Sequence, residues 1–475
     1  MTRQNDIDFL GDFRMVIDGR TEGSEKTIEV INPATEQPVG HAPDCSADQL
    51  DAAIASARQA FMSWKATPIA ERQALLRAIA DRIESIVEPL ALLLTREQGK
   101  PLADARGEIL RATQWFRFYA EQDLPVGRHT EPGGQEVTVR RVPLGVVGAI
   151  APWNYPISMA LWKLAPALLA GNAVVLKPSP FTPLTTLKLC EALIDILPPG
   201  LVNALSGGDN LGPWISEHPG IDKIAFTGST ATGRAVMRSS AANLKRLTLE
   251  LGGNDPAIVL PDVDVEETAG KLFWAAFRNN GQLCVAAKRI YVHDSIYDDF
   301  AAAIGKIARS TAPAPGEQEG AVLGPVQNRI QYDKVRGLIA ASRAAGLGFL
   351  SEPGSFDGPG FFIAPTIIDN PPEDARIVQE EPFGPVVPLL RYHDIDEVIR
   401  RANESEYGLA ASVWAKDADL AEEVAVRIES GTVWINTAHI LSPSIPFSGR
   451  KQSGIGVENG KEVLLEYTGI QAIIR

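Results

Sequence analysis

The feature of this sequence that most restricts its fold is a regular alternation of short apolar runs with helical segments. The apolar runs of the first series are 146–150, 173–176, 202–205, 223–226 and 246–249. Gly171 and Pro183 lie where intervening helices are expected to end and to begin. Such alternation predicts a doubly wound parallel sheet with right-handed crossovers. Ligands of such a sheet bind at the carboxyl ends of its strands.

A second alternation predicts a second Rossmann-like α/β domain, as expected for a chain of 475 residues, which can bury more than one core. Its expected strands are 257–260, 289–292, 386–390, 409–414 and 432–435. Three helices are expected before both series, at 50–64, 68–99 and 102–119. Ser46 and Gln49 form a plausible capping box for the first of them. The Pro- and Gly-rich stretch 312–324 is expected to be a surface loop.

Residues 124–142 interrupt the helical pattern. Two short alternating stretches flank the turn Glu131-Pro132-Gly133-Gly134-Gln135, which predicts a protruding β-hairpin. The apolar tail at 470–474 is a strand without a partner nearby in sequence, and it could pair with this hairpin in its own or a neighbouring subunit. The hairpin is therefore either a subunit contact or a simple connector.

Charge and cysteine content exclude several classes of function. The net charge of −14 disfavours nucleic acid or an anionic membrane surface as a partner. The first eight residues lack the apolar region of a signal peptide, and no apolar run is long enough to span a bilayer. Three cysteines indicate a reducing compartment, so a cytoplasmic location is expected. Six scattered histidines show no metal-ligand spacing, so no metal site is expected.

Three residues in separate segments have the chemistry of an acyl-transfer site. Cys284 could act as a nucleophile, and Glu250 could remove a proton from water. Asn154 could donate to the oxygen of a tetrahedral intermediate. Taken alone, a single cysteine is more often structural, as Cys190 in its helical stretch is expected to be.

A strand, a glycine turn and a helix start follow one another at 223–233. Backbone N–H groups at such a helix N-terminus can hold a phosphate, although Gly228-Ser229-Thr230-x-x-Gly233 lacks one glycine of the dinucleotide fingerprint. Lys177 ends the neighbouring strand and could donate to a ribose or a phosphate. Each signal is weak alone, but both lie at the same edge of the predicted sheet.

Six ordered motifs cover the chain from about Ile31 to its C-terminus. They are Pro152-Trp153-Asn154-Tyr155-Pro156, Lys177-Pro178-Ser179, Gly228-Ser229-Thr230-x-x-Gly233, Glu250-Leu251-Gly252-Gly253, Phe277-x-x-Asn280-Gly281-Gln282-x-Cys284 and Glu381-x-Phe383-Gly384-Pro385. This series closely resembles the aldehyde dehydrogenase superfamily, in its NAD(P)-dependent, non-acylating branch. The acylating relatives typically lack the general base, whereas Glu250 is present here.

The resemblance implies a role for each matching residue. Cys284 would attack the aldehyde carbon, and Asn154 with the Cys284 N–H would hold the oxyanion of the thiohemiacetal. Hydride loss to the nicotinamide would leave a thioester, which water activated by Glu250 would hydrolyse to the acid. The residues implied in cofactor binding are Ile150, Trp153, Lys177, Ser179, Pro180, Gly228, Ser229, Gly233, Leu251, Glu381 and Phe383. Burial is expected to raise the pKa of Glu250, because an exposed carboxylate is a weak base.

Three positions depart from the pattern of relatives. Pro180 stands where many NAD-using relatives carry a Glu that repels a 2′-phosphate, so NAD is expected as cofactor with NADP not excluded. Lys288 replaces a common Ser or Thr, and Ser448 replaces a glycine. Neither is expected to touch a catalytic atom, and both are expected to adjust local packing.

The resemblance also implies a substrate pocket with little charge. Its expected residues are Trp153, Met159, Trp162, Leu283, Val285, Thr437, His439 and Phe447. Such a set favours an apolar or aromatic aldehyde of modest size, and it contains no arginine that would indicate a carboxylate-bearing semialdehyde. His439 is the one polar group expected to contact a substrate oxygen, unless it is an ordinary loop histidine.

The expected organisation has three parts. Residues 1–122 and 143–251 would form the NAD(P)-binding domain, and residues 252–440 the catalytic domain. Residues 123–142 and 456–475 would form an oligomerisation arm of a homodimer or homotetramer. Two rival functions use the same fold: a thioesterase or acyltransferase without redox chemistry, and a catalytically silent binding protein. Cofactor-dependent turnover distinguishes the aldehyde dehydrogenase from the thioesterase or acyltransferase. The presence of Cys284, Glu250 and Asn154 disfavours the silent binding protein.

Overall fold

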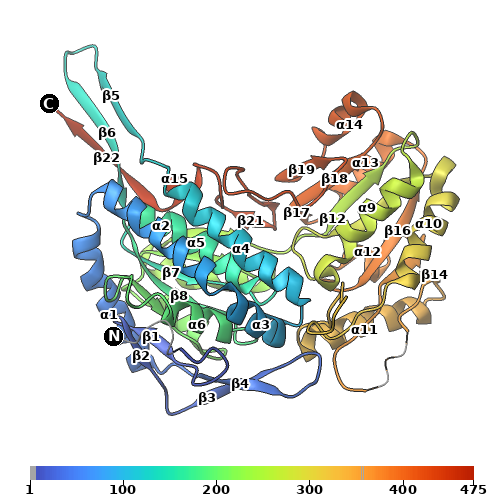
Figure 1. Cartoon of the computed structure of the whole chain (residues 1–475). Helices are drawn as coiled ribbons and strands as arrows, with labels where there is room; N and C mark the ends of the chain where they lie inside the picture. The colour runs from blue at the N-terminus through green and yellow to red at the C-terminus, as the bar shows by residue number, and fades with distance from the viewer. Residues whose placement is uncertain (1–6, 355, 357) are drawn as a thin grey trace.

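The computed structural model describes residues 7–354, 356 and 358–475. Two α/β bodies lie side by side, and a β-arm projects from the first of them (Figure 1). The start of the N-terminal segment in which no signal peptide is expected, residues 1–6, lies outside the described residues. Within the described residues, no helix combines the length and the apolar character needed to cross a membrane.

The first body is built on an eight-stranded sheet. Its strands, in spatial order, are β2 (Arg20–Glu22), β1 (Met15–Ile17), β9 (Val202–Ala204), β8 (Ala173–Lys177), β7 (Val146–Ile150), β10 (Lys223–Thr227), β11 (Arg246–Glu250) and β21 (Gly454–Ile455). The five strands from β9 to β11 are parallel, which confirms the doubly wound sheet. The antiparallel edge strands β1, β2 and β21 have no signal in the sequence pattern.

Helices cover this sheet directly or pack on the outside of the helices that do. They are α1 (Ala47–Trp64), α2 (Ile69–Ser85), α3 (Val87–Gln98), α4 (Leu102–Tyr119), α5 (Pro156–Ala170), α6 (Leu184–Glu191), α7 (Leu211–Glu217), α8 (Thr230–Ser240) and α15 (Val463–Glu466), with a 3-10 turn at Ala241–Asn243. The capping box of Ser46 and Gln49 is confirmed. The single helix expected over 68–99 is wrong, because the chain leaves helical geometry at Ile86. Both halves bury apolar side chains, so the hydrophobic spacing continues across the break.

The second body is built on a seven-stranded sheet. Its strands, in spatial order, are β14 (Gly348–Ser351), β15 (Thr366–Asp369), β16 (Val386–Tyr392), β13 (Ala287–His293), β12 (Asp255–Val259), β18 (Ala410–Trp414) and β19 (Thr432–Ile435). All its pairings except that of β14 are parallel, and the five expected strands are present. Its helices are α9 (Val265–Phe277), α10 (Tyr297–Ser310), α11 (Arg329–Ala344), α12 (Arg376–Gln379), α13 (Ile395–Asn403) and α14 (Ala418–Ala425), with 3-10 turns at Arg278–Gly281 and Asp294–Ile296.

Three smaller sheets complete the fold. The arm contains β5 (Val126–Thr130), β6 (Glu136–Pro143) and β22 (Thr468–Ile474), so the C-terminal strand pairs with the hairpin of its own chain. A hairpin of β3 (Thr27–Ile31) and β4 (Pro38–Pro43) and a short pair of β17 (Tyr407–Gly408) and β20 (Arg450–Lys451) form the others. Residues 312–324 form no helix or strand, as expected of a loop.

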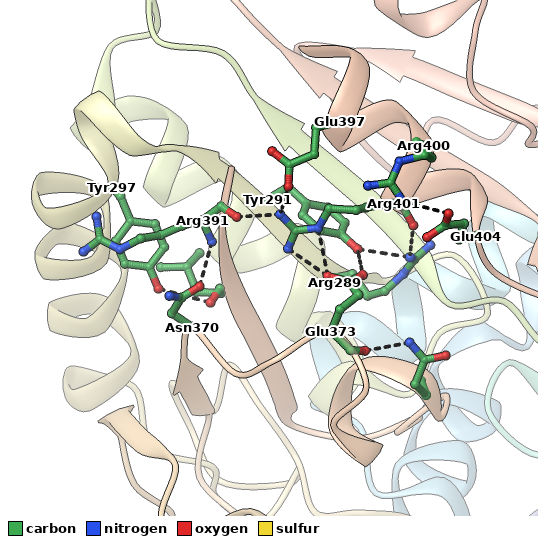
Figure 2. A network of polar contacts seen from close by, with 12 residues as sticks. Arg289, Tyr291, Tyr297, Asn370, Glu373, Arg391, Glu397, Arg400, Arg401 and Glu404 are labelled. Atoms are coloured by element: carbon green, nitrogen blue, oxygen red, sulfur yellow. Dashed lines mark hydrogen bonds and ion pairs between the residues drawn. The ribbon is translucent and has the colours of Figure 1, made fainter. Parts of the chain in front are cut away.

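A polar network fixes the start of the second body (Figure 2). Arg289 on β13 donates to the carbonyl oxygens of Asn254, Arg401 and Ala402. Arg401 and the Tyr291 hydroxyl both bind Glu373, with donor–oxygen distances of 2.7 Å. The segment that follows β11 is therefore tied to β13 and α13, and this segment connects Glu250 to the second sheet.

Candidate active site

A cavity of about 340 Å³ lies where the two bodies meet, and Cys284, Glu250 and Asn154 all line it. These side chains come from the loop before β13, the end of β11 and the loop before α5. The parallel strands β7 and β11 both end at this edge of the first sheet, since both pair in register with β10. The three residues expected to carry the chemistry are thus brought to one place.

Left-handed backbone geometry shapes the loop that carries Cys284. Asn279, Asn280 and Gly281 have φ values of 50°, 55° and 71°. Asn adopts this region more readily than most residues, and glycine does so without strain. A Cβ on Gly281 would lie 2.3 Å from the Gly384 carbonyl oxygen, so the loop packs directly against the Glu381–Pro385 motif. The half-buried thiol of Cys284 has its pKa raised well above the usual range by burial and by the charge of Glu250.

Asn154 is buried and held by the loop that carries the nucleophile. Its Nδ2 donates to the Gln282 carbonyl oxygen over 3.0 Å, which leaves its second N–H free to donate into the cavity. Its own carbonyl accepts from Lys100 Nζ over 3.0 Å. Lys100 is fully buried and ion-paired with Glu108. This pair, which sequence reasoning missed, fixes the backbone of Asn154.

Glu250 is buried, and neither of its carboxylate oxygens has a hydrogen-bond partner of normal geometry among the described residues. Burial raises its pKa to about 7, and the charge of Lys163 is the largest opposing influence. The expectation that burial raises this pKa is confirmed. A carboxylate in this state is a base matched to neutral pH, because its proton affinity is near that of the solution.

A second buried ion pair stands behind Glu250. Lys163 on α5 lies 2.8 Å from Glu458 Oε1 and donates to Thr227 Oγ1 over the same distance. Both partners are almost fully buried, and no described residue forms a hydrogen bond with Glu458 Oε2. Sequence reasoning missed this pair because its members are 295 positions apart and carry no local motif.

The residues expected to bind a cofactor fall into two groups. Trp153, Gly228, Ser229, Leu251, Glu381 and Phe383 line the cavity. Ile150, Lys177, Ser179, Pro180 and Gly233 lie outside its wall. Ile150 and Lys177 end the paired strands β7 and β8, at the same edge of the sheet. Lys177 is buried, and that burial lowers its pKa to about 8. Its ammonium donates to the Pro178 carbonyl oxygen over 3.3 Å.

Seven of the eight residues expected in the substrate pocket line the cavity, and Thr437 does not. Thr437 belongs to the same loop as His439, and the resemblance implied both residues. His439 lines the cavity, and burial lowers its pKa to about 4, so the ring is neutral. Trp115 and Trp162 stack on this side with ring centroids 4.7 Å apart.

The pocket is not free of charge, which corrects the expectation from sequence. Arg111 on α4 and Arg278 after α9 also line the cavity, as do Tyr155 and Ser158. Both arginines act on the pKa of Tyr155, and neither forms an ion pair within the described part of the chain. His439 is therefore not the one polar group of the pocket. Arg111 lies on α4, outside every motif, and Arg278 stands inside the Phe277–Cys284 motif, where the sequence does not show which way its side chain points.

The expectation that Lys288 only adjusts packing is also wrong. Its buried ammonium donates to the carbonyl oxygen of Cys284, to that of Gly253 over 2.8 Å and to Glu381 Oε1 over 2.8 Å. It therefore contacts three segments of the site. No cluster of three or more His, Cys, Asp or Glu side chains that could hold a metal ion occurs among the described residues.

Residues 20–473 match the model of the aldehyde dehydrogenase family. The chain belongs to this family. It is 41% identical to the mitochondrial aldehyde dehydrogenase of Leishmania tarentolae, over 95% of this chain and 92% of that protein. It is 38% identical to the phenylacetaldehyde dehydrogenase of Pseudomonas fluorescens, over 95% and 93% of the two chains.

A solved structure of an aldehyde dehydrogenase from Bacillus cereus in complex with NAD⁺ superimposes on this chain with a TM-score of 0.96. It shares 37% identity and covers 98% of this chain and 97% of that one. As a family member of this length and fold, the protein is an aldehyde dehydrogenase that uses a nicotinamide cofactor.

Proposed function

We propose that this aldehyde dehydrogenase oxidises an aldehyde to the carboxylic acid with NAD⁺, using Cys284 as nucleophile, Asn154 as oxyanion donor and Glu250 as general base. The observation that carries the proposal is the meeting of a thiol, a free amide N–H and an unpartnered buried carboxylate on one cavity wall. The test is cysteine-dependent reduction of NAD⁺ or NADP⁺ with a panel of aliphatic, aromatic and anionic aldehydes. Turnover without either cofactor would favour the non-redox rival.

The first chemical task of the chain is to add sulfur to the aldehyde carbon. Cys284 Sγ forms the C–S bond, and negative charge moves to the carbonyl oxygen. The free N–H of Asn154 and the backbone N–H of Cys284 hold this oxygen, and each such donor contributes roughly 3 kcal/mol. Because its raised pKa keeps the thiol neutral in the free enzyme, its proton must pass to solvent water before the thiolate attacks.

The residues at the sheet edge fit a dinucleotide. Within the part of the chain that the structure describes, the buried Lys177 ammonium makes one weak hydrogen bond and has no carboxylate within ion-pair distance, so it can donate to a polar ligand. Ser229 caps α8, whose first N–H groups can hold a pyrophosphate with Gly228 and Gly233. The residues proposed for the adenosine end are Ile150, Lys177, Ser179 and Pro180, and those for the nicotinamide end are Trp153, Leu251, Glu381 and Phe383. When bound, NAD⁺ supplies the hydride acceptor.

Glu250 has the second chemical task, which is to remove a proton from water for hydrolysis of the Cys284 thioester. Its burial and its pKa of about 7 support this role.

The first body is proposed to be the NAD(P)-binding domain, formed by residues 1–122 and 143–251. The second body is proposed to be the catalytic domain, formed by residues 252–440. Pro180 carries no carboxylate that would repel the 2′-phosphate of NADP, so NADP is proposed as an alternative cofactor to NAD. Three free thiols support a cytoplasmic location.

The substrate is proposed to be an aldehyde with an apolar body and an anionic far end. Trp115, Trp162 and Phe447 supply an apolar wall near Cys284, whereas Arg111 and Arg278 supply unpaired positive charge. The two acidic residues of the wall, Glu250 and Glu381, have the catalytic and cofactor roles proposed above. An arginine without an ion pair binds a carboxylate through charge-assisted hydrogen bonds.

Replacing Arg278 by methionine is expected to lower kcat/KM about tenfold or more for an ω-carboxy aldehyde, since a hydrogen bond between charged groups is lost. The matching methyl ester should lose little, because it carries no charge. Steady-state kinetics with both substrates measures the difference, and Arg238→Met, at an exposed position of α8, is the control variant. Equal losses for acid and ester would contradict the proposed substrate class without affecting the aldehyde chemistry.

The β-arm is proposed to join copies of this chain. β22 is an edge strand in the described sheet, and Ile470 and Ile474 on one of its faces are 67% and 66% exposed. Exposed apolar side chains on an unpaired edge favour association. Replacing both isoleucines by lysine is expected to shift the protein to a monomer in size-exclusion chromatography with light scattering. The control is Gln471→Lys on the opposite face. An unchanged mass would place the contact elsewhere.

A further inference from the structure

Lys288 connects three functional segments through one buried ammonium group. It is 2% exposed on β13, and its three N–H donors have three acceptors: the carbonyl oxygens of Cys284 and Gly253 and the carboxylate oxygen Glu381 Oε1. The first acceptor belongs to the nucleophile and the second to the segment that follows Glu250. The third belongs to the residue proposed to hold the nicotinamide ribose.

The same contacts orient the Glu381 carboxylate. Its Oε1 accepts from Lys288 Nζ over 2.8 Å and from the Gly253 N–H over 3.1 Å. Its Oε2 makes no hydrogen bond in the described part of the chain and faces Gly252, where a Cβ would lie 2.6 Å away. One oxygen is thus anchored, and the other is left as an acceptor.

We infer that Lys288 is a positioning residue that links cofactor binding to the nucleophile. It holds Glu381 with one oxygen free for a ribose hydroxyl and fixes the Cys284 and Gly253 carbonyls around the same ammonium. This inference rests on the proposed function of Glu381. Common Ser or Thr residues at this position carry no charge, so the arrangement distinguishes this chain from those relatives.

The charge of Lys288 also reaches the thiol. The charged groups that act on Cys284 are Glu250 and Asp255, which raise its pKa, and Lys288, which lowers it. Asp255 is buried, and burial raises its own pKa to about 8. Lys288 is the one cation among these groups, so its removal should make the thiolate harder to form.

The test uses Lys288→Met, which keeps the side-chain length and removes the charge. In the enzyme without cofactor, the pH midpoint for iodoacetamide alkylation of Cys284 is expected to rise by about one unit. The Kd for NAD⁺, measured by tryptophan fluorescence, is expected to rise about tenfold. Lys223→Met is the control, since Lys223 is equally buried but binds Thr248 outside the site. A merely structural lysine would lower the melting temperature without moving the alkylation midpoint.

A double-mutant cycle with Glu381→Gln separates this inference from the proposed function. If Lys288 acts through Glu381, the double variant has the Kd of Glu381→Gln alone. Additive losses, or an unchanged midpoint and Kd in Lys288→Met, would overturn the inference. If Glu381→Gln itself left the Kd unchanged, the proposed role of Glu381 would be at fault instead. Should Lys288→Met fail to fold, Lys288→Gln retains N–H donors for the carbonyls, and the same outcomes decide.

Discussion

Replacing Cys284 by alanine is expected to lower kcat by at least about 10⁴-fold, because no other group can form the covalent bond to the aldehyde carbon. Cys284 is the one cysteine on the cavity wall, and it is half-buried rather than enclosed. The measurement is steady-state reduction of NAD⁺ with the best aldehyde of the panel. Binding of NAD⁺ should remain close to that of the wild type, since the thiol is not a proposed cofactor ligand.

The matched control for this variant is Cys190→Ala. Cys190 lies on α6 with 1% of its surface exposed, and burial raises its pKa to about 12, so it is an unreactive packing residue. Its removal should affect stability and leave kcat nearly unchanged. Substantial turnover by Cys284→Ala, or an equal loss in both variants, would contradict the assignment of the nucleophile.

Replacing Glu250 by glutamine is expected to lower steady-state kcat by about 10²- to 10⁴-fold, the usual contribution of a general base. Formation of the thioester needs no water, so an initial burst of one NADH per active site should survive. Stopped-flow absorbance separates the burst from the slow steady state. Undiminished steady-state turnover would exclude Glu250 as the base.

The pH dependence gives a second test of Glu250. A base acts in its ionised form, so hydrolysis in the wild type should increase as the pH rises through about 7, the pKa of the buried carboxylate. This increase of the hydrolysis rate with pH should be missing in Glu250→Gln. Glu97→Gln is the control, because Glu97 is also buried with its pKa raised to about 7 but binds the N-terminus of α6. If the increase in hydrolysis rate near pH 7 were lost in both variants, it would be a general effect of buried carboxylates and would not identify Glu250 as the base.

Most strands of both sheets were predictable because parallel strands are buried on both faces and therefore read as short apolar runs. The short antiparallel strands β1, β2 and β21 were not predictable, since they lie outside the alternation of strands with helices on which the prediction depends. The break at Ile86 escaped notice for a related reason. Hydrophobic spacing records which side chains are buried, and burial continues through that residue.

The chemistry of the site was largely readable from the chain. Cys284, Glu250 and Asn154 stand in short motifs whose glycines and asparagines carry the local backbone geometry, as the left-handed loop at 279–281 illustrates. The backbone conformation of a short loop depends on residues that are adjacent in sequence, so a sequence motif can predict that conformation. The same motifs indicated the family, which residues 20–473 match.

Only the tertiary structure could decide which charged groups surround those motifs. Lys163 meets Glu458 across 295 positions, and Lys288 meets Glu381 across 93. Arg111 and Arg278 reach the same cavity from opposite bodies. A sequence lists charges, but a pKa or a binding preference depends on distance and burial in space. The chain therefore determined its fold class and reaction by itself, whereas packing determined how its base, its cofactor-binding carboxylate and its substrate pocket are charged.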